Sequence, residues 1–230
     1  MGQNCVQMHR RRFGMNYEDG TLFRFLAARS MEPEKAAKMF VEYQNWKASI
    51  VPSGSISEDE VHDHLDDNII FMGGLTKEGY RLLVCQGRRH RPITDKLKFE
   101  KFLIYMLEKV LASVYEGGRE TGNEKLVAIV DLGGLSFKNA DARAFITGFQ
   151  VQQAYYPGIL AKCYIWDMPR FFVSIWNVIS SFLEKTTTEM ITIVNTEDEK
   201  RELVEGIGED VIPVEYGGKA KFVTIQDFAL

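Results

Sequence analysis

The sequence is poor in the residues that disulfides, metal centres and nucleophilic catalysis require. Its 230 residues include three cysteines and four histidines, and every histidine lies in the first 90 positions. The cysteines (Cys5, Cys85 and Cys163) are odd in number and widely spaced, without a Cys-x-x-Cys pair, which argues against a disulfide framework. This usage favours a reducing compartment in which Cys85 and Cys163 serve as small core residues.

A secretory signal and a bilayer-spanning run are also missing. The first residues are polar and basic, without the apolar segment that a signal peptide needs. An uncharged helical stretch at 171–183 is shorter than the about 20 residues that cross a bilayer. A net charge of −4 argues against a general nucleic-acid binder, whose affinity depends on neutralising phosphates. We therefore expect a cytoplasmic chain that binds no nucleic acid.

The N-terminus leaves two interpretations open. Gly2 follows the initiator and Cys5 lies nearby, but Val6 stands where myristoylation prefers Ser or Thr. One acyl chain together with the basic cluster at 9–12 would hold the protein peripherally at a membrane. A disordered start explains the same residues and is the interpretation that we favour.

Motifs of common enzyme active sites are absent. The sequence has no Gly-x-Ser-x-Gly elbow, no Gly-x-Gly-x-x-Gly loop and no Walker loop. Asp131 and Asp167 each follow a predicted strand, where α/β enzymes place functional groups, but no catalytic partner accompanies them. We expect no catalytic residues and no enzymatic activity.

A metal site is the other chemical interpretation, at His62, His64, Asp66 and Asp67. Residues two apart on a helix point to different sides, so these side chains do not converge on one ion. A solvated acidic helix face is the better interpretation. We expect neither a metal nor a cofactor.

What is present is a clear change of pattern along the chain. Helical spacing marks 17–30, a second helix from Pro33, and a short acidic helix whose capping box is Ser57-x-x-Glu60. Further on, β-rich runs at 69–72, 80–85, 125–130, 162–166 and 190–194, with a last one near 221–225, alternate with helical patterns. This alternation predicts an α/β fold with a mostly parallel sheet, which we expect to have five strands.

The helix that follows Pro169 has only a narrow polar stripe, formed by Ser174, Asn177 and Ser181. Its apolar positions are Phe171, Phe172, Ile175, Trp176, Ile179, Phe182 and Leu183, and no charge occurs between 171 and 183. An ordinary surface helix has a wider polar face, so this helix either lies deep in the core or borders lipid. The pattern alone does not decide between the two.

Several short motifs, taken in order, resemble those of the CRAL-TRIO lipid-binding domain. They are Phe23-Arg24-Phe25-Leu26-Ala27-Ala28-Arg29, Ile129-Val130-Asp131-Leu132-Gly133-Gly134, the Tyr155-Tyr156-Pro157 corner, the Phe/Trp-rich helix and Glu215-Tyr216-Gly217-Gly218. The resemblance covers roughly 20–220. It implies a small N-terminal helical lobe at 1–67, and at 68–230 a lipid-binding domain whose hydrophobic pocket is closed by a gate helix. It also implies that Asp131 is a turn and hydrogen-bonding residue.

The resemblance further implies a set of lipid-binding residues. They are Arg29, Leu83, Leu126, Ala128, Val130, Phe171, Phe172, Ile175, Trp176, Ile179, Phe182, Thr187 and Met190. Of the family's phosphatidylinositol-headgroup residues, an Arg is retained as Arg29 and a Thr as Thr187. A Lys, a Glu and a second Lys are replaced by Ser30, Gly158 and Met190.

The phosphatidylcholine-contacting Ser, Thr and Tyr of the family would fall on Leu126, Ala128 and Leu83. Aliphatic side chains thus replace most of the polar groups that read a headgroup. This favours a lipid of low polarity, such as a sterol or a prenyl lipid, although a differently held phospholipid stays open.

Two functions follow from the resemblance. The first is a lipid-transfer protein that encloses one lipid and exchanges it at a membrane surface. The second is a membrane-recruitment or protein-interaction module that does not transfer lipid. A basic run, Arg88, Arg89, His90, Arg91, Lys96, Lys98 and Lys101, could contact anionic headgroups or simply be a solvated loop.

Overall fold

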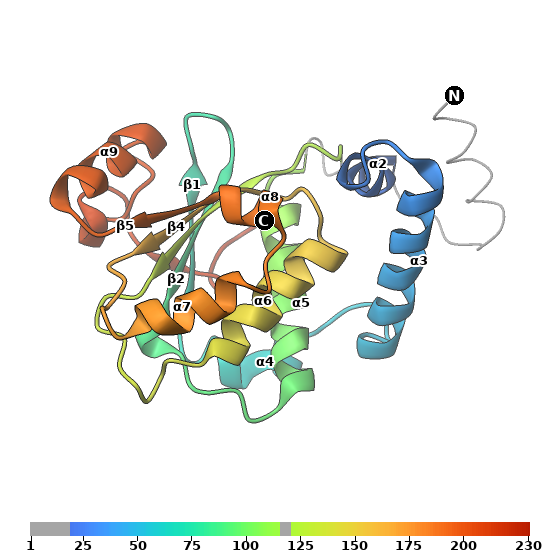
Figure 1. The fold of residues 1–230 in the computed structure, drawn as a ribbon, viewed down its shortest axis with the longest axis horizontal. Coiled ribbons are helices and arrows are strands. Elements are labelled where there is room, and N and C mark those ends of the chain that lie inside the picture. The colour runs from blue at the N-terminus through green and yellow to red at the C-terminus, as the bar shows by residue number, and fades with distance from the viewer. Residues whose placement is uncertain (1–18, 116–120) are drawn as a thin grey trace.

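The computed structural model describes residues 19–115 and 121–230 and shows a sheet covered by helices (Figure 1). The strands are β1 (Ile70–Leu75), β2 (Arg81–Gln86), β3 (Leu126–Asp131), β4 (Leu160–Trp166), β5 (Ile191–Val194) and β6 (Val223–Thr224). Their order in the sheet is β5-β4-β3-β2-β1-β6. Strands β2 to β5 pair in parallel, while β1 pairs antiparallel with β2 and with β6. The predicted α/β class and mostly parallel sheet are confirmed.

The predicted number of five strands is wrong, because the sheet has six strands within residues 19–115 and 121–230. The run predicted near 221–225 forms the two-residue strand β6, in which Val223 and Thr224 pair with Met72 and Phe71 of β1. Without it, β1 would leave its backbone N–H and C=O groups unpaired at the edge of the sheet.

Helices cover both faces of the sheet, as buried parallel strands require (Figure 1). On one face lie α5 (Lys96–Ala112) and α6 (Ala142–Tyr155), and on the other lies α9 (Glu197–Ile207). Short 3-10 turns occur at η1 (Gly87–Arg89) and η2 (Val214–Tyr216). Along β3, Leu126, Ala128 and Val130 pack in the core on the α5 and α6 face. Val127 and Ile129 pack in the core on the α9 face.

The N-terminal helices are α2 (Asp19–Ala28), α3 (Pro33–Ile50) and α4 (Glu58–Leu65). Helices α2 and α3 pack on each other, and Trp46 of α3 stacks on Tyr155 at the end of α6, with ring centroids 3.8 Å apart. The predicted capping box at Ser57 and Glu60 is present, and α4 packs against α5. The division of the chain at residue 67 stays a prediction.

The apolar helix is α7 (Phe172–Ser180), followed by α8 (Lys185–Glu189). It begins three residues after Pro169, because residues 170 and 171 form a turn. Phe172, Trp176 and Ile179 are buried in the core, whereas Val173 and Val178 are 47% and 54% exposed. Burial therefore accounts for one face of α7, whereas its exposed face carries Val173 and Val178 together with the polar Ser174 and Asn177.

Candidate functional site

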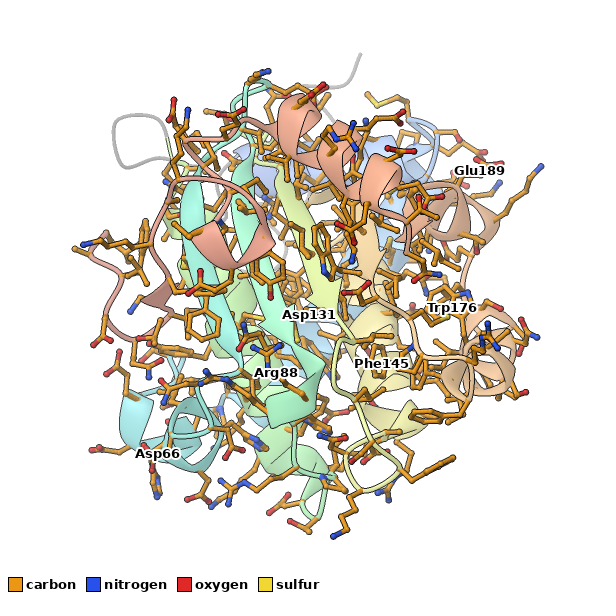
Figure 2. All side chains as sticks on the ribbon, turned by 90° about the vertical axis from the view of Figure 1, so that its left-hand side faces the viewer. Asp66, Arg88, Asp131, Phe145, Trp176 and Glu189 are labelled. Carbon is orange, nitrogen blue, oxygen red and sulfur yellow. The ribbon has the colours of Figure 1, made fainter. Side chains whose placement is uncertain are left out.

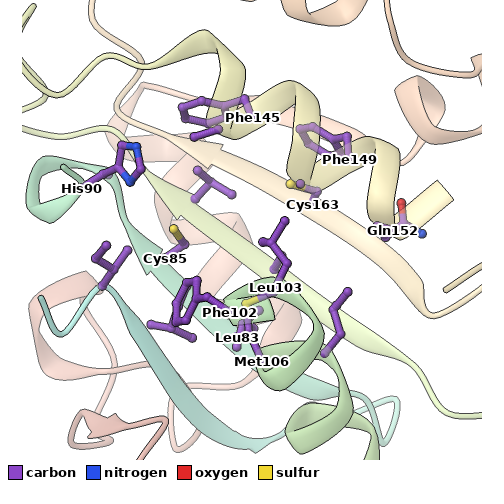
Figure 3. Close-up of a pocket in the computed structure, with 18 of the residues that line it drawn as sticks. Leu83, Cys85, His90, Phe102, Leu103, Met106, Phe145, Phe149, Gln152 and Cys163 are labelled. Atoms are coloured by element: carbon purple, nitrogen blue, oxygen red, sulfur yellow. The ribbon is translucent and has the colours of Figure 1, made fainter. Parts of the chain in front are cut away.

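A cavity of about 190 Å³ lies between the sheet and helices α5 and α6 (Figure 3). The sheet lines it with Ile69, Ile70, Leu83, Cys85, Leu126, Ala128, Val130, Leu160 and Cys163. Helix α5 adds Phe99, Phe102, Leu103, Met106 and Leu107, and α6 adds Ala144, Phe145, Gly148, Phe149 and Gln152. Gly87, His90 and Asn139 complete the lining.

Small side chains on opposite walls keep the cavity open. On the sheet, Ala128 and Cys163 stand opposite each other in the β3–β4 register and both line the space. On α6, a side chain at Gly148 would meet no atom closer than Leu103, at 4.0 Å. Because protein interiors normally fill such gaps, this combination is a feature of the sequence rather than loose packing.

The walls carry no fixed charge, since the described residues that line the cavity include no Asp, Glu, Lys or Arg. Burial raises the pKa of the Cys85 and Cys163 thiols to about 12, so both stay protonated at neutral pH. Burial also lowers the pKa of His90, and its imidazole is therefore neutral near pH 7. The site is thus suited to an uncharged, mainly apolar group.

Four predicted site residues line this cavity together: Leu83, Leu126, Ala128 and Val130. The predicted gate residues of α7 do not line it. Phe172 packs behind α6, with its ring centroid 5.3 Å from that of Phe145, which does line the cavity. Trp176, Ile179 and Ile175 belong to the same core.

The remaining predicted residues lie away from the cavity. Phe171 contacts Phe137 across 4.2 Å between ring centroids, and Phe182 is 51% exposed. Arg29 follows α2 and donates to the carbonyl of Ala28, while Thr187 is buried in α8. The carbonyl of Met190 accepts a hydrogen bond from the Cys163 amide, at the start of β5. The structure does not bring Arg29, Thr187 and Met190 together with the cavity.

Sequence reasoning missed the contribution of α6. Phe145, Gly148, Phe149 and Gln152 follow the i, i+3, i+4, i+7 spacing of one helix face, and all four line the cavity. The signal that could have found them is the combination of a glycine and a glutamine within an otherwise aromatic stripe.

The basic run is engaged by carboxylates rather than forming a separate cationic patch. Three of its cations pair with the acidic helix α4 or the turn after it: Arg91 with Asp67, Lys98 with Asp63, and Lys101 with Glu60. Arg88 pairs with Asp131. These contacts lower the net charge that this surface can offer to an anionic membrane, because each pair is nearly neutral.

Asp131 lies at the end of β3, where Figure 2 shows it beside Arg88. Its carboxylate accepts hydrogen bonds from Tyr216 Oη at 2.7 Å, Gly133 N at 2.8 Å and Arg88 Nη1 at 3.0 Å. The structure shows it in the turn and hydrogen-bonding role that the resemblance implied. Asp167 is held separately, by Lys200 Nζ at 2.8 Å.

The candidate metal ligands do not form a site. In the part of the chain that the structure describes, no group of three His, Cys, Asp or Glu side chains could hold a metal ion. His62 pairs with Asp63, and the ring of His64 lies 5.1 Å from that of Phe102.

Across residues 19–115 and 121–230, no helix is both long and apolar enough to cross a membrane.

Comparison with known proteins agrees with this architecture. The sequence model of the CRAL/TRIO domain matches residues 65–218, and the chain belongs to that family. It is 23% identical over 209 residues to a CRAL-TRIO domain-containing protein of Schizosaccharomyces pombe, covering 87% of this chain and 45% of the relative. It is 26% identical over 223 residues to the phosphatidylinositol transfer protein CSR1 of Eremothecium gossypii, covering 90% and 48%.

The chain thus spans about half the length of these two relatives. Among solved structures, that of Sfh5 superposes with a TM-score of 0.62 at 17% identity, covering 97% of this chain and 80% of the other. At that identity the likeness concerns the fold alone.

Proposed function

We propose that this chain binds one lipid between the sheet and helices α5 and α6 and exchanges it at membranes. The observation that carries the proposal is an apolar cavity with uncharged walls in a CRAL/TRIO fold. The similarity to the Eremothecium protein, which is named as a phosphatidylinositol transfer protein, supports the general class. Burying a CH₂ group is worth about 0.8 kcal/mol, so leaving a 16-carbon tail in water costs about 12 kcal/mol. A carrier must therefore enclose its lipid until it reaches a membrane.

The cavity must enlarge to take a whole lipid. Its volume of about 190 Å³ is not far above the roughly 150 Å³ that hold a benzene molecule. We propose that α6 moves outward with α7, which packs on its outer side through Phe172 and Phe145. In this proposal α7 keeps its gate role, although it acts through α6 rather than as the wall itself.

The outer face of this helix pair offers a membrane contact. Val173, Val178, Phe182 and Phe137 are exposed apolar side chains on α7 and the segments beside it. Contact with the bilayer interface would offset the exposure of apolar surface as the cavity opens. The proposal therefore places peripheral membrane association at α7.

The ligand is proposed to be of low polarity, and Gly158 and Met190 supply neither the acid nor the cation of a phosphoinositide site. We expect phosphatidylinositol transfer between vesicles to be weak relative to transfer of sterols or prenyl lipids. Transfer of phosphatidylinositol at a comparable rate would contradict this expectation.

A non-transferring module is the second candidate. It is favoured by the closed packing, in which Phe172 and Ile179 are fully buried and the cavity is small. Native mass spectrometry of protein purified without detergent separates the two functions. A reproducible one-to-one lipid that exchanges with vesicles supports the carrier, whereas protein without lipid and without exchange supports the module.

A further inference from the structure

Two polar atoms at the cavity are buried without a hydrogen-bond partner. They are Oε1 of Gln152 on α6 and Nε2 of His90, which follows η1. Figure 3 shows the two side chains on opposite sides of the cavity. A buried polar group without a partner is costly, because it has lost its hydrogen bonds to water without replacing them.

A third polar side chain in the lining, Asn139, shows the usual alternative. Its Oδ1 accepts from the Ser136 amide at 2.7 Å, and its Nδ2 donates to the Arg88 carbonyl at 2.6 Å. Asn139 is therefore satisfied by the protein. Gln152 and His90 are different, since each retains one buried atom for which the described chain supplies no partner.

The chemistry of Gln152 restricts what its partner can be. Its Nε2 is directed to the carbonyl of Tyr156 at 3.5 Å, which leaves Oε1 as the unsatisfied atom. A carbonyl oxygen only accepts, so its partner must donate a hydrogen bond. A neutral imidazole nitrogen can be donor or acceptor according to its tautomer, and His90 is therefore less restrictive.

We propose that the lipid in this cavity is uncharged and donates a hydrogen bond to Gln152 Oε1 from a hydroxyl group. This inference rests on the proposed lipid-binding function and specifies the ligand class. Because no residue of the lining carries a charge, a phosphate or carboxylate inside the cavity would have no ionic partner there. Free fatty alcohols, sterols and acylglycerols with a free hydroxyl have the required chemistry, whereas ethers and fully esterified lipids do not.

Two probes of nearly equal length test the demand for a donor: 1-hexadecanol and its methyl ether. The ether is the more apolar, so burial of apolar surface alone would favour it. The protein is incubated with an equimolar mixture, and the bound fraction of each probe is measured by native mass spectrometry. We expect wild-type protein to retain the alcohol at least about tenfold over the ether, because the ether leaves Oε1 unsatisfied.

Substitutions assign the preference to its atom. Gln152→Met removes the amide at similar volume and should bring the alcohol-to-ether ratio to near one, while Gln152→Asn, which keeps an amide, should restore part of it. Gln153→Met is the matched control, because Gln153 accepts from the Glu184 amide at 2.9 Å instead of lining the cavity. Its ratio should equal that of the wild type. Circular dichroism confirms that each variant is folded before binding is measured.

The outcomes separate this inference from the proposed function. If the wild type binds both probes equally, or if Gln152→Met keeps the preference, the inference is wrong and lipid binding stands. If the preference is lost in His90→Phe but kept in Gln152→Met, His90 rather than Gln152 is the partner of the ligand hydroxyl, and the inference is also wrong. If the wild type retains neither probe and no other lipid, both the inference and the proposed function fail.

Discussion

The two faces of the sheet use neighbouring residues of the same strands in opposite ways. On the α9 face, Val127 and Ile129 of β3 are almost completely buried against Leu203 and Val204. On the α6 face, Ala128 and Val130 of the same strand border the cavity. Because successive side chains of a strand point to opposite faces, one six-residue segment serves both a closed core and an open one.

Polar contacts accentuate the difference. At the α9 face, the Asp131 carboxylate has three donors and ties β3 to Tyr216 of η2 and to Arg88. At the cavity, Gln152 and His90 each have an unsatisfied atom. Gln86, which donates to Tyr216 in the network of the α9 face, also has a buried oxygen without a partner. The cavity differs because its two unsatisfied atoms border open space that a ligand can enter.

The largest effect on stability is expected from Ile129→Ala on the closed face. Ile129 is fully buried, and removing its side chain leaves a cavity in a packed core. We expect the free energy of unfolding to fall by about 2–5 kcal/mol, measured by urea denaturation. Lipid content per folded molecule should not change, and a loss of lipid at full folding would show that the two faces are coupled.

Asp131→Asn should have the next largest effect. The substitution keeps the shape but removes the charge that Arg88 and Tyr216 donate to. Hydrogen bonds to charged groups contribute about 1.5–3 kcal/mol, and a decrease in unfolding free energy of that order is expected. Tyr216→Phe removes one of the donors and should cost less. Equal stability of wild type and Asp131→Asn would show that the charge of Asp131 does not stabilise this face.

Ala128→Leu tests the open face, with a smaller effect on stability. The larger side chain fills space that the cavity already provides, so we expect a change below about 1 kcal/mol and a large loss of co-purified lipid. The matched control is Val127→Leu, one residue away on the closed face, where overpacking should cost about 1–3 kcal/mol without altering lipid content. The reverse pattern would exchange the roles assigned to the two faces.

The smallest effect concerns pH. Burial lowers the pKa of His64 and His90 below the ordinary value of 6.5, although nearby carboxylates oppose the shift. The unfolded chain therefore binds protons first, and these groups reduce stability as the pH falls from 6.5 through their folded pKa values. Above pH 6.5 they have no effect.

We expect His90→Gln to flatten the loss of stability between pH 6.5 and pH 5, measured by urea denaturation at each pH. His62→Gln is the control, because His62 is exposed and pairs at the surface with Asp63. An unchanged slope in His90→Gln would show that burial of this imidazole does not contribute to acid sensitivity.

The main strands and helices and their order could be predicted from the sequence. Alternating strands and helices fixed the α/β class, and the ordered motifs indicated the family to which residues 65–218 belong. The resemblance to the CRAL-TRIO domain also implied four sheet residues that line the cavity, Leu83, Leu126, Ala128 and Val130, and their role in lipid binding stays a prediction. The element types are local features, because the side-chain periodicity of a strand or helix depends on neighbouring residues.

Which helices complete the site depends on tertiary packing and could not be predicted from the sequence. Periodicity reports that a helix face is buried but not what it is buried against, so the apolar pattern of α7 could not place its side chains behind α6. The same holds for the pairing of the run near 221–225 with the edge of β1, and for the basic run, three of whose cations pair with α4 or the turn after it. Each depends on contacts between residues distant in sequence, and such contacts are set by the global packing of the chain.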